Sequence, residues 1–137
     1  MSITLAQYFI GRTHSIAQST SANDLLNKVN ALLYDYTLTT GNEVQINPAT
    51  NSLISGVTEG GFRLPECTQG APNSSHKQAQ AVDIHDEDGE LDKWITDKIL
   101  AQYNLWREAP EATEGWCHLT TRPQASYITT GRRSFYP

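Results

Sequence analysis

The chain has 137 residues, and its 10 Lys and Arg against 15 Asp and Glu give a formal net charge of −5. This length predicts one domain, and the acidic balance argues against a sequence-independent nucleic-acid binder, so we expect no nucleic-acid partner. No apolar run approaches the ~18 residues that a membrane span needs, so we expect no integral membrane segment.

Two amphipathic segments predict helices, and a shorter apolar segment precedes them. Residues 5–10 are apolar enough to dock as a helical turn. Residues 21–36 carry Leu, Val and Tyr at the i, i+3, i+4, i+7 spacing of a buried stripe, and residues 90–103 carry a similar stripe after an acidic entry at 86–88. We therefore expect helices over 21–36 and 90–103.

Alternating side chains predict two strands, over residues 80–85 and 115–121. In the first strand Asp83 lies on the face opposite the apolar side chains that flank it. In the second strand His118 lies on the face opposite Cys117. We expect Cys117 to be packed in the core, and helices together with strands make this an α+β domain.

A region rich in Gly and Asn follows the first predicted helix. Weaker β signals at 43–46 and 52–63 predict short strands there. The tail from residue 122 is predicted to be extended. Cys67 and Cys117 are the only cysteines and form no CxxC pair, so we expect two reduced thiols and no thiolate zinc site.

The residues with the clearest chemical potential are two histidines and an aspartate. His76 precedes Asp83 by seven residues, and His118 follows on the later strand. A catalytic zinc takes three nitrogen or oxygen ligands and keeps one position open for water. Spacing alone leaves other interpretations open, because a chain with four histidines readily offers such a triplet.

The same segments resemble a known family. The motif residues are Ser74, His76, Ala79, Ala81 and Asp83, followed by Trp116, Cys117 and His118. This pattern is similar to that of the M15 group of zinc DD-peptidases, and the N-terminal helix and tail resemble a compact, bacteriophage-encoded branch. The resemblance implies a Hedgehog/DD-peptidase-like fold with flanking helices on a small antiparallel sheet, and one catalytic Zn²⁺ on His76, Asp83 and His118. Ala79 replaces the glycine of the family pattern and fits only if its φ is negative.

The resemblance also implies residues that act on substrate. Gly60-Gly61-Phe62-Arg63 resembles an element whose Arg binds substrate or a developing oxyanion, which makes Arg63 a catalytic and substrate-binding candidate. Ser74 and Trp116 are further substrate-binding candidates. The general base is Glu108 or Glu114, with Glu111 a third candidate. On a flat strand Glu114 would lie ~13 Å from His118, and the layout that begins at Glu108 resembles the bacteriophage branch, so we favour Glu108.

We expect a monomeric zinc metallopeptidase that hydrolyses peptidoglycan stem peptides. It would act as a D-Ala–D-Ala carboxypeptidase or as an L-Ala–D-Glu-type endopeptidase of the endolysin kind. The alternative is a non-catalytic virion or cell-wall-binding module with the same fold. The N-terminus shows no secretory signal, so we expect synthesis in a host cytoplasm and action at the cell wall, after holin-type release or as part of a virion. Arg122, Arg132 and Arg133 form a cluster that is suited either to contact with an anionic glycan wall or to ordinary salt-bridging surface, and we favour the second interpretation.

Overall fold

A computed structural model describes all residues of the chain, 1–137. The helices are α1 (Leu5–Phe9), α2 (Ile16–Thr40), α3 (Glu90–Trp94), α4 (Asp97–Tyr103) and α5 (Tyr127–Thr130), with short 3-10 turns η1 (Ser75–Gln78) and η2 (Pro110–Ala112). The strands are β1 (Ala81–His85), β2 (Trp106–Glu108), β3 (Trp116–Thr120) and β4 (Ser134–Phe135). The predicted mixture of helices and strands is confirmed.

The four strands form one sheet in the order β1-β3-β2-β4. β1 and β2 both pair antiparallel with β3, whereas β4 pairs parallel with β2. The expectation of a purely antiparallel sheet was therefore wrong at this edge, because the tail returns through α5 and adds β4 in the same direction as β2. The two strands predicted over 80–85 and 115–121 are confirmed as β1 and β3.

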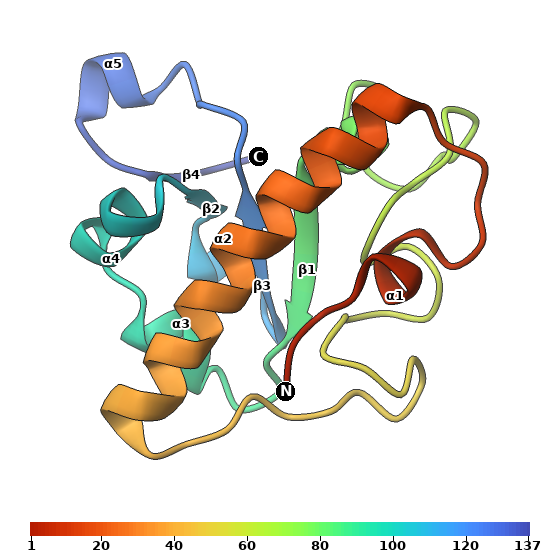
Figure 1. The fold of residues 1–137 in the computed structure, drawn as a ribbon. Helices are drawn as coiled ribbons and strands as arrows, with labels where there is room; N and C mark the ends of the chain where they lie inside the picture. The colour runs from red at the N-terminus through yellow and green to blue at the C-terminus, as the bar shows by residue number, and fades with distance from the viewer.

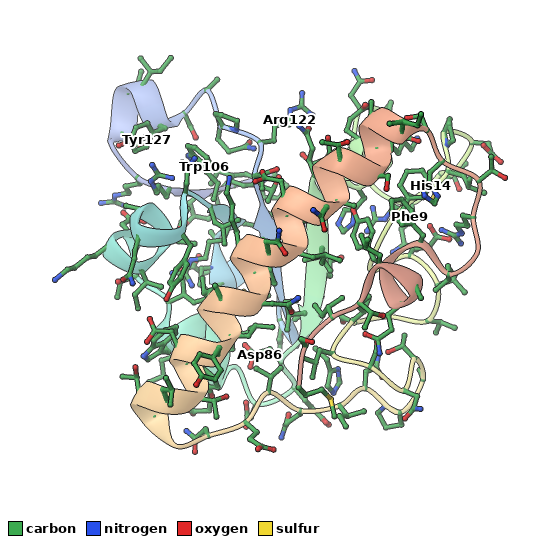
Figure 2. The ribbon with its side chains drawn as sticks, viewed as in Figure 1. Phe9, His14, Asp86, Trp106, Arg122 and Tyr127 are labelled. Carbon is green, nitrogen blue, oxygen red and sulfur yellow. The ribbon has the colours of Figure 1, made fainter.

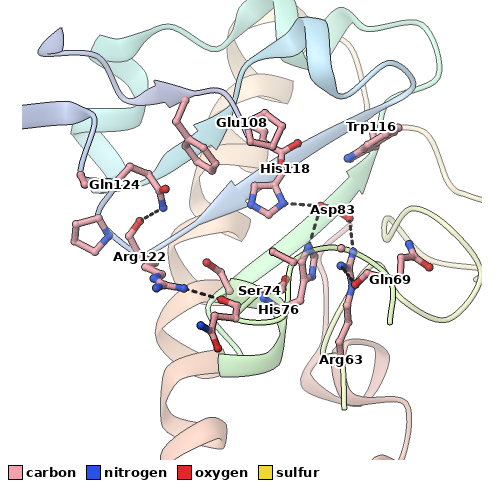
Figure 3. Close-up of a pocket in the computed structure, with 18 residues that line it drawn as sticks. Arg63, Gln69, Ser74, His76, Asp83, Glu108, Trp116, His118, Arg122 and Gln124 are labelled. Atoms are coloured by element: carbon pink, nitrogen blue, oxygen red, sulfur yellow. Dashed lines mark hydrogen bonds and ion pairs between the residues drawn. The ribbon is translucent and has the colours of Figure 1, made fainter. Parts of the chain in front are cut away.

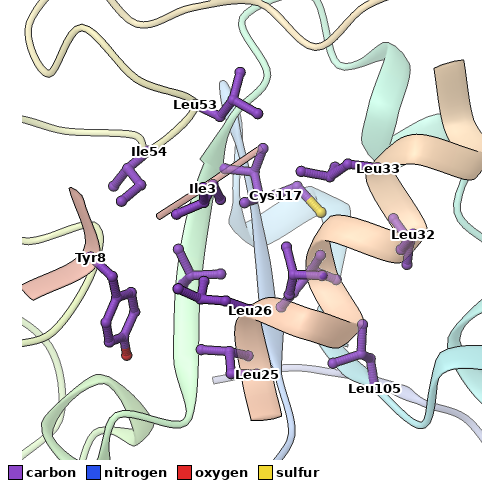
Figure 4. Packing of buried hydrophobic residues seen from close by; sticks show 14 of the residues in the cluster. Ile3, Tyr8, Leu25, Leu26, Leu32, Leu33, Leu53, Ile54, Leu105 and Cys117 are labelled. Atoms are coloured by element: carbon purple, nitrogen blue, oxygen red, sulfur yellow. The ribbon is translucent and has the colours of Figure 1, made fainter. Parts of the chain in front are cut away.

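The long helix α2 crosses one face of the sheet (Figure 1). Its buried stripe packs with the apolar side chains of β1 and β3 in a single core (Figure 4). This stripe consists of Ala22, Leu25, Leu26, Val29, Leu32, Leu33 and Tyr36. Because Val82, Ile84, Cys117 and Leu119 face this core, the polar residues between them face the other side of the sheet.

Helix α2 is longer than the predicted 21–36. A capping box begins it, in which the Ser15 side chain accepts from the Gln18 main-chain N–H and the Gln18 side chain accepts from Ser15. Gly41 ends it at a φ of 75°, a left-handed conformation that glycine adopts without strain. The apolar stripe alone missed both ends, since the first turn, Ile16–Ser19, and the last turn, Thr37–Thr40, contribute no buried side chain.

The helix predicted over 90–103 is two helices, α3 and α4. Ile95 is extended, and the Thr96 side chain accepts the main-chain N–H of Ile99 and so begins a new helix. The apolar stripe persists across the break because Leu91, Ile95 and Leu100 are all buried. A shared apolar face therefore concealed the change of direction.

The β signals at 43–46 and 52–63 were wrong as strands. This region forms only two isolated bridges, Asn47 with Ser52 and Ile54 with Ile84. The Asn47 side chain donates to the carbonyls of Ile54 and Gly56 at 2.9 and 2.8 Å, so a side chain holds the loop in place of a strand ladder.

Both ends of the chain pack on the domain. The short helix α1 buries Tyr8, confirming the predicted helical turn, and the Tyr8 hydroxyl donates to the Ala81 carbonyl at 2.8 Å. The tail is only partly extended, because α5 interrupts it. There the Arg133 guanidinium lies 4.2 Å above the Trp106 ring. Tyr127 lies near Trp106 (Figure 2) and meets its ring edge-on. None of the helices combines the length and apolar character needed to cross a bilayer.

Candidate metal centre

His76 lies in η1, directly before β1. The Ser74 hydroxyl begins this turn by accepting the main-chain N–H of His76 at 3.2 Å. The His76 side chain is almost completely buried, with 2% of its surface exposed. Ser74, predicted to bind substrate, thus also positions a predicted ligand.

The orientation of the His76 ring follows from one hydrogen bond. Its Nδ1 lies 2.8 Å from the carbonyl oxygen of Gly61. A carbonyl can only accept, so Nδ1 carries the proton, and Nε2 of the neutral ring is left with a free lone pair. The loop can bring the Gly61 carbonyl to His76 only because residue 61 is glycine. A Cβ atom at this position would lie 2.5 Å from the carbonyl oxygen of Tyr8.

Asp83 and His118 meet across the sheet. They are direct partners in the antiparallel pairing of β1 with β3, and both lie on the face away from α2. His118 Nδ1 lies 2.9 Å from Asp83 Oδ1. The same oxygen lies 3.2 Å from His76 Nε2, and the two imidazole centroids are 5.2 Å apart. Potential ligand atoms of all three side chains lie within 4.8 Å of one another (Figure 3).

The arrangement fits a cation. His76 Nε2 is buried and makes no hydrogen bond, although it faces a carboxylate oxygen. An unpartnered buried polar atom costs free energy, and a divalent ion held by His76 and Asp83 would give this nitrogen a partner. The buried group of His76, Asp83 and His118 could therefore hold a metal ion.

The charge of Asp83 is stabilised by its neighbours. Burial alone would raise the pKa of the Asp83 carboxyl. The positive charge and hydrogen bonds of His76 and His118, when these rings are protonated in the absence of a metal, outweigh burial and hold that pKa well below its usual range. Asp83 is therefore a carboxylate at neutral pH, which is the form that binds a metal.

Arg63 approaches the same aspartate from the loop before η1. Its Nη2 lies 3.5 Å from Asp83 Oδ2. Its Nε donates to the Glu59 carbonyl at 2.7 Å and its Nη1 to the Gln69 carbonyl at 3.2 Å. The guanidinium is therefore fixed beside the centre, and 8% of the side chain is exposed.

Glu108 is brought to the centre by β2, a strand that the sequence did not predict. The β2–β3 register pairs Arg107 with Leu119 and, continued by one residue, places Glu108 beside His118. Asp83, His118 and Glu108 thus form one row across three strands, on one face of the sheet. Glu108 lines the cavity over this row.

The other two glutamates lie elsewhere. Glu114 is exposed in the turn before β3 and does not line that cavity. Glu111 is exposed as well, and its carboxylate accepts from the Tyr136 hydroxyl at 3.3 Å. Of the three candidate bases, the structure brings only Glu108 to the predicted ligands.

A polar cavity of about 630 Å³ opens over the three predicted ligands. Its wall includes the predicted substrate-binding residues Arg63, Ser74 and Trp116. It also includes Arg122 and Gln124, which the sequence analysis did not propose for the site. The one available signal was their position immediately after the strand that carries His118.

Ala79 corrects one expectation. Its φ is +56°, in the left-handed region, whereas we expected that alanine would fit only with a negative φ. Ala79 ends η1, and its main-chain N–H points back to the carbonyls of Ser75 and His76. The turn therefore keeps the left-handed geometry that favours glycine and accepts the strain of a Cβ atom.

The two cysteines and the three tail arginines lie outside the predicted ligand set. Cys67 and Cys117 are free thiols, and burial raises the pKa of Cys117, as expected for a packed residue. The expected salt bridges of the three tail arginines were wrong. Arg122 and Arg132 form none, and Arg133 stacks on an aromatic ring instead.

Comparisons with protein-family models, curated proteins and solved structures find no match for this chain. The geometry of the centre is therefore the basis for the functional argument.

Proposed function

We propose that this protein is a zinc-dependent metallopeptidase that hydrolyses peptide bonds in bacterial peptidoglycan stem peptides, on a Hedgehog/DD-peptidase-like fold. The observation that carries the proposal is the buried convergence of His76, Asp83 and His118 beneath a polar cavity. Two imidazoles and one carboxylate match the three-ligand set of hydrolytic zinc sites, which leave a position for water.

The surrounding residues supply the remaining parts of a hydrolytic site. When bound, zinc would polarise the scissile carbonyl and acidify a water molecule. The Glu108 carboxylate, beside His118 in the same cavity, accepts a proton from the attacking water and passes it to the leaving amine. Arg63 holds a fixed positive charge at the wall, which stabilises negative charge that develops on the carbonyl oxygen.

The substrate class rests on the resemblance of the Ser74–Asp83 and Trp116–His118 motifs to cell-wall peptidases. The cavity is consistent with a peptide substrate, because amides, hydroxyls and both signs of charge line it. No glutamate lies close before His118 in the sequence, which would favour the non-catalytic module. Glu108 supports the peptidase instead, because it lines the cavity over the three predicted ligands.

The test is digestion of purified peptidoglycan by zinc-loaded protein, followed by mass spectrometry of the released fragments. We expect cleavage that a chelator abolishes and added zinc restores. Glu108→Gln should lower the rate by about 10²- to 10⁴-fold, as expected for loss of a general base. Glu114→Gln should leave it unchanged because Glu114 lies outside the cavity. Binding of peptidoglycan without release of fragments would contradict the proposal and favour a cell-wall-binding module.

A further inference from the structure

Arg122 is held in place at the cavity wall by the loop that follows β3. Its main-chain N–H donates to the Thr120 hydroxyl at 3.0 Å, and the Gln124 side chain donates to its carbonyl at 2.9 Å. Its Nη1 donates to the Asn73 carbonyl at 2.9 Å. The Arg122 backbone and the Nη1 atom of its guanidinium are therefore held in place without a ligand.

The rest of the Arg122 guanidinium has no protein partner. Arg63 uses Nε and both Nη atoms, and it contacts the carboxylate of Asp83. Arg122 makes only the single bond from Nη1, and no carboxylate lies within salt-bridge distance of it. Its Nε and Nη2 donors are thus free to bind a planar anion with two parallel hydrogen bonds.

The two arginines lie on opposite sides of the metal centre. In Figure 3, Arg122 is drawn beside Ser74 on one side of His76, and Arg63 lies on the other side. A second cavity of about 400 Å³ shares four lining residues with the larger one, and Arg122 does not line it. The shared residues are Arg63, Gln69, Asp83 and Trp116. The cleft therefore extends to both sides of the centre, and Arg122 belongs to the larger side.

We propose that Arg122 is a carboxylate-binding residue of this cleft and selects peptide substrates that carry an acidic group on the side of the larger cavity. The inference rests on the proposed function. A stem peptide offers such a carboxylate from two sources, its C-terminus and the free carboxylate of its glutamate. Both present the same planar anion to the guanidinium.

The experiment measures peptide binding by isothermal titration calorimetry. The probes are the stem pentapeptide L-Ala-γ-D-Glu-L-Lys-D-Ala-D-Ala, its C-terminal amide and its isoglutamine analogue. Each is titrated into the metal-free full chain, which leaves the peptide intact, and into the zinc-loaded chain. The proteins are wild type, Arg122→Gln and the control Arg132→Gln, which alters an exposed arginine outside the cavity.

We expect Arg122→Gln to bind the parent peptide about ten- to hundredfold more weakly than wild type does, the loss typical of a charge-assisted pair. One of the two amidated peptides should bind wild type as weakly as the parent peptide binds Arg122→Gln, and it should bind Arg122→Gln no more weakly than that. The carboxylate that is amidated in this peptide is then the one that Arg122 binds. Arg132→Gln should behave as wild type. Equal binding of the parent peptide by wild type and Arg122→Gln would overturn the inference, as would an absence of binding by wild type.

The two proposals can fail separately. If the zinc-loaded chain leaves the peptides intact while binding still depends on Arg122, the carboxylate site stands and the peptidase function fails. If peptides are cleaved with no dependence of binding on Arg122, the peptidase function stands and this inference fails. Thermal unfolding of each variant shows whether it is folded, and the exposed position of Arg122 predicts wild-type stability.

Discussion

The substitution Gly61→Ala tests how the His76 ring is positioned. The new Cβ atom would lie 2.5 Å from the Tyr8 carbonyl oxygen, and an ordinary contact begins at 3.4 Å, so the loop must move by about 0.9 Å. The Gly61 carbonyl accepts from His76 Nδ1 at 2.8 Å, and a shift of that size carries it beyond hydrogen-bond range. Losing such a support typically costs 10- to 100-fold in metal affinity.

The assay for Gly61→Ala is zinc affinity, measured by competition with a chromophoric chelator. We expect the 10- to 100-fold loss together with a destabilisation of about 1–3 kcal/mol from overpacking. The control is Gly89→Ala, at a φ of +73° in open space and outside both cavities at the centre. It should lower the unfolding temperature through backbone strain and leave zinc affinity unchanged. Equal zinc affinity in Gly61→Ala and wild type would refute the role assigned to this carbonyl.

Three further predictions concern stability. Tyr8→Phe leaves a buried main-chain carbonyl unpaired and should cost about 1–3 kcal/mol in thermal unfolding, whereas the exposed Tyr34→Phe should cost nothing; equal losses would contradict this. The hydrogen bond from Arg12 lowers the pKa of Glu59. The stabilisation that the ionised Glu59 carboxylate gives the fold is therefore complete above the unfolded pKa and is lost as pH falls through the lower folded pKa. Between pH 6 and 3 the unfolding temperature of Glu59→Gln should thus fall less than that of wild type, and parallel curves would exclude this effect. Arg107→Ala leaves the buried Asp92 without its cation and should lower the unfolding temperature by about 10 °C or more; a change of 2 °C or less would show that the pair adds little.

Part of the centre could be predicted from sequence because it depends on strand periodicity. The alternation that places Asp83 opposite the core side chains also places His118 there, and antiparallel pairing of their strands makes them neighbours. His76 could be predicted only through the motif, since its position depends on a short turn and on the close approach of Gly61.

Other parts depend on tertiary contacts that leave little trace in sequence. The strand that carries Glu108 has three residues, too few for alternation to be detected, and only its pairing with β3 places the carboxylate beside His118. Arg122 was interpreted as surface because its charge alone says nothing of the cavity. The break at Ile95 was missed because its side chain stays in the apolar stripe while its backbone leaves the helix.

The most direct test of the central claim is metal binding by the full chain, measured as zinc content after equilibration together with the unfolding temperature. We predict one zinc per chain, and at a free zinc concentration of 100 times Kd the linkage of about 2.7 kcal/mol should raise the unfolding temperature by about 9 °C. His76→Ala should lose both effects, and His14→Ala, at an exposed histidine outside the centre, should keep them. A chain that takes up no zinc, or a His76→Ala variant that still binds one equivalent with the same stabilisation, would contradict the account.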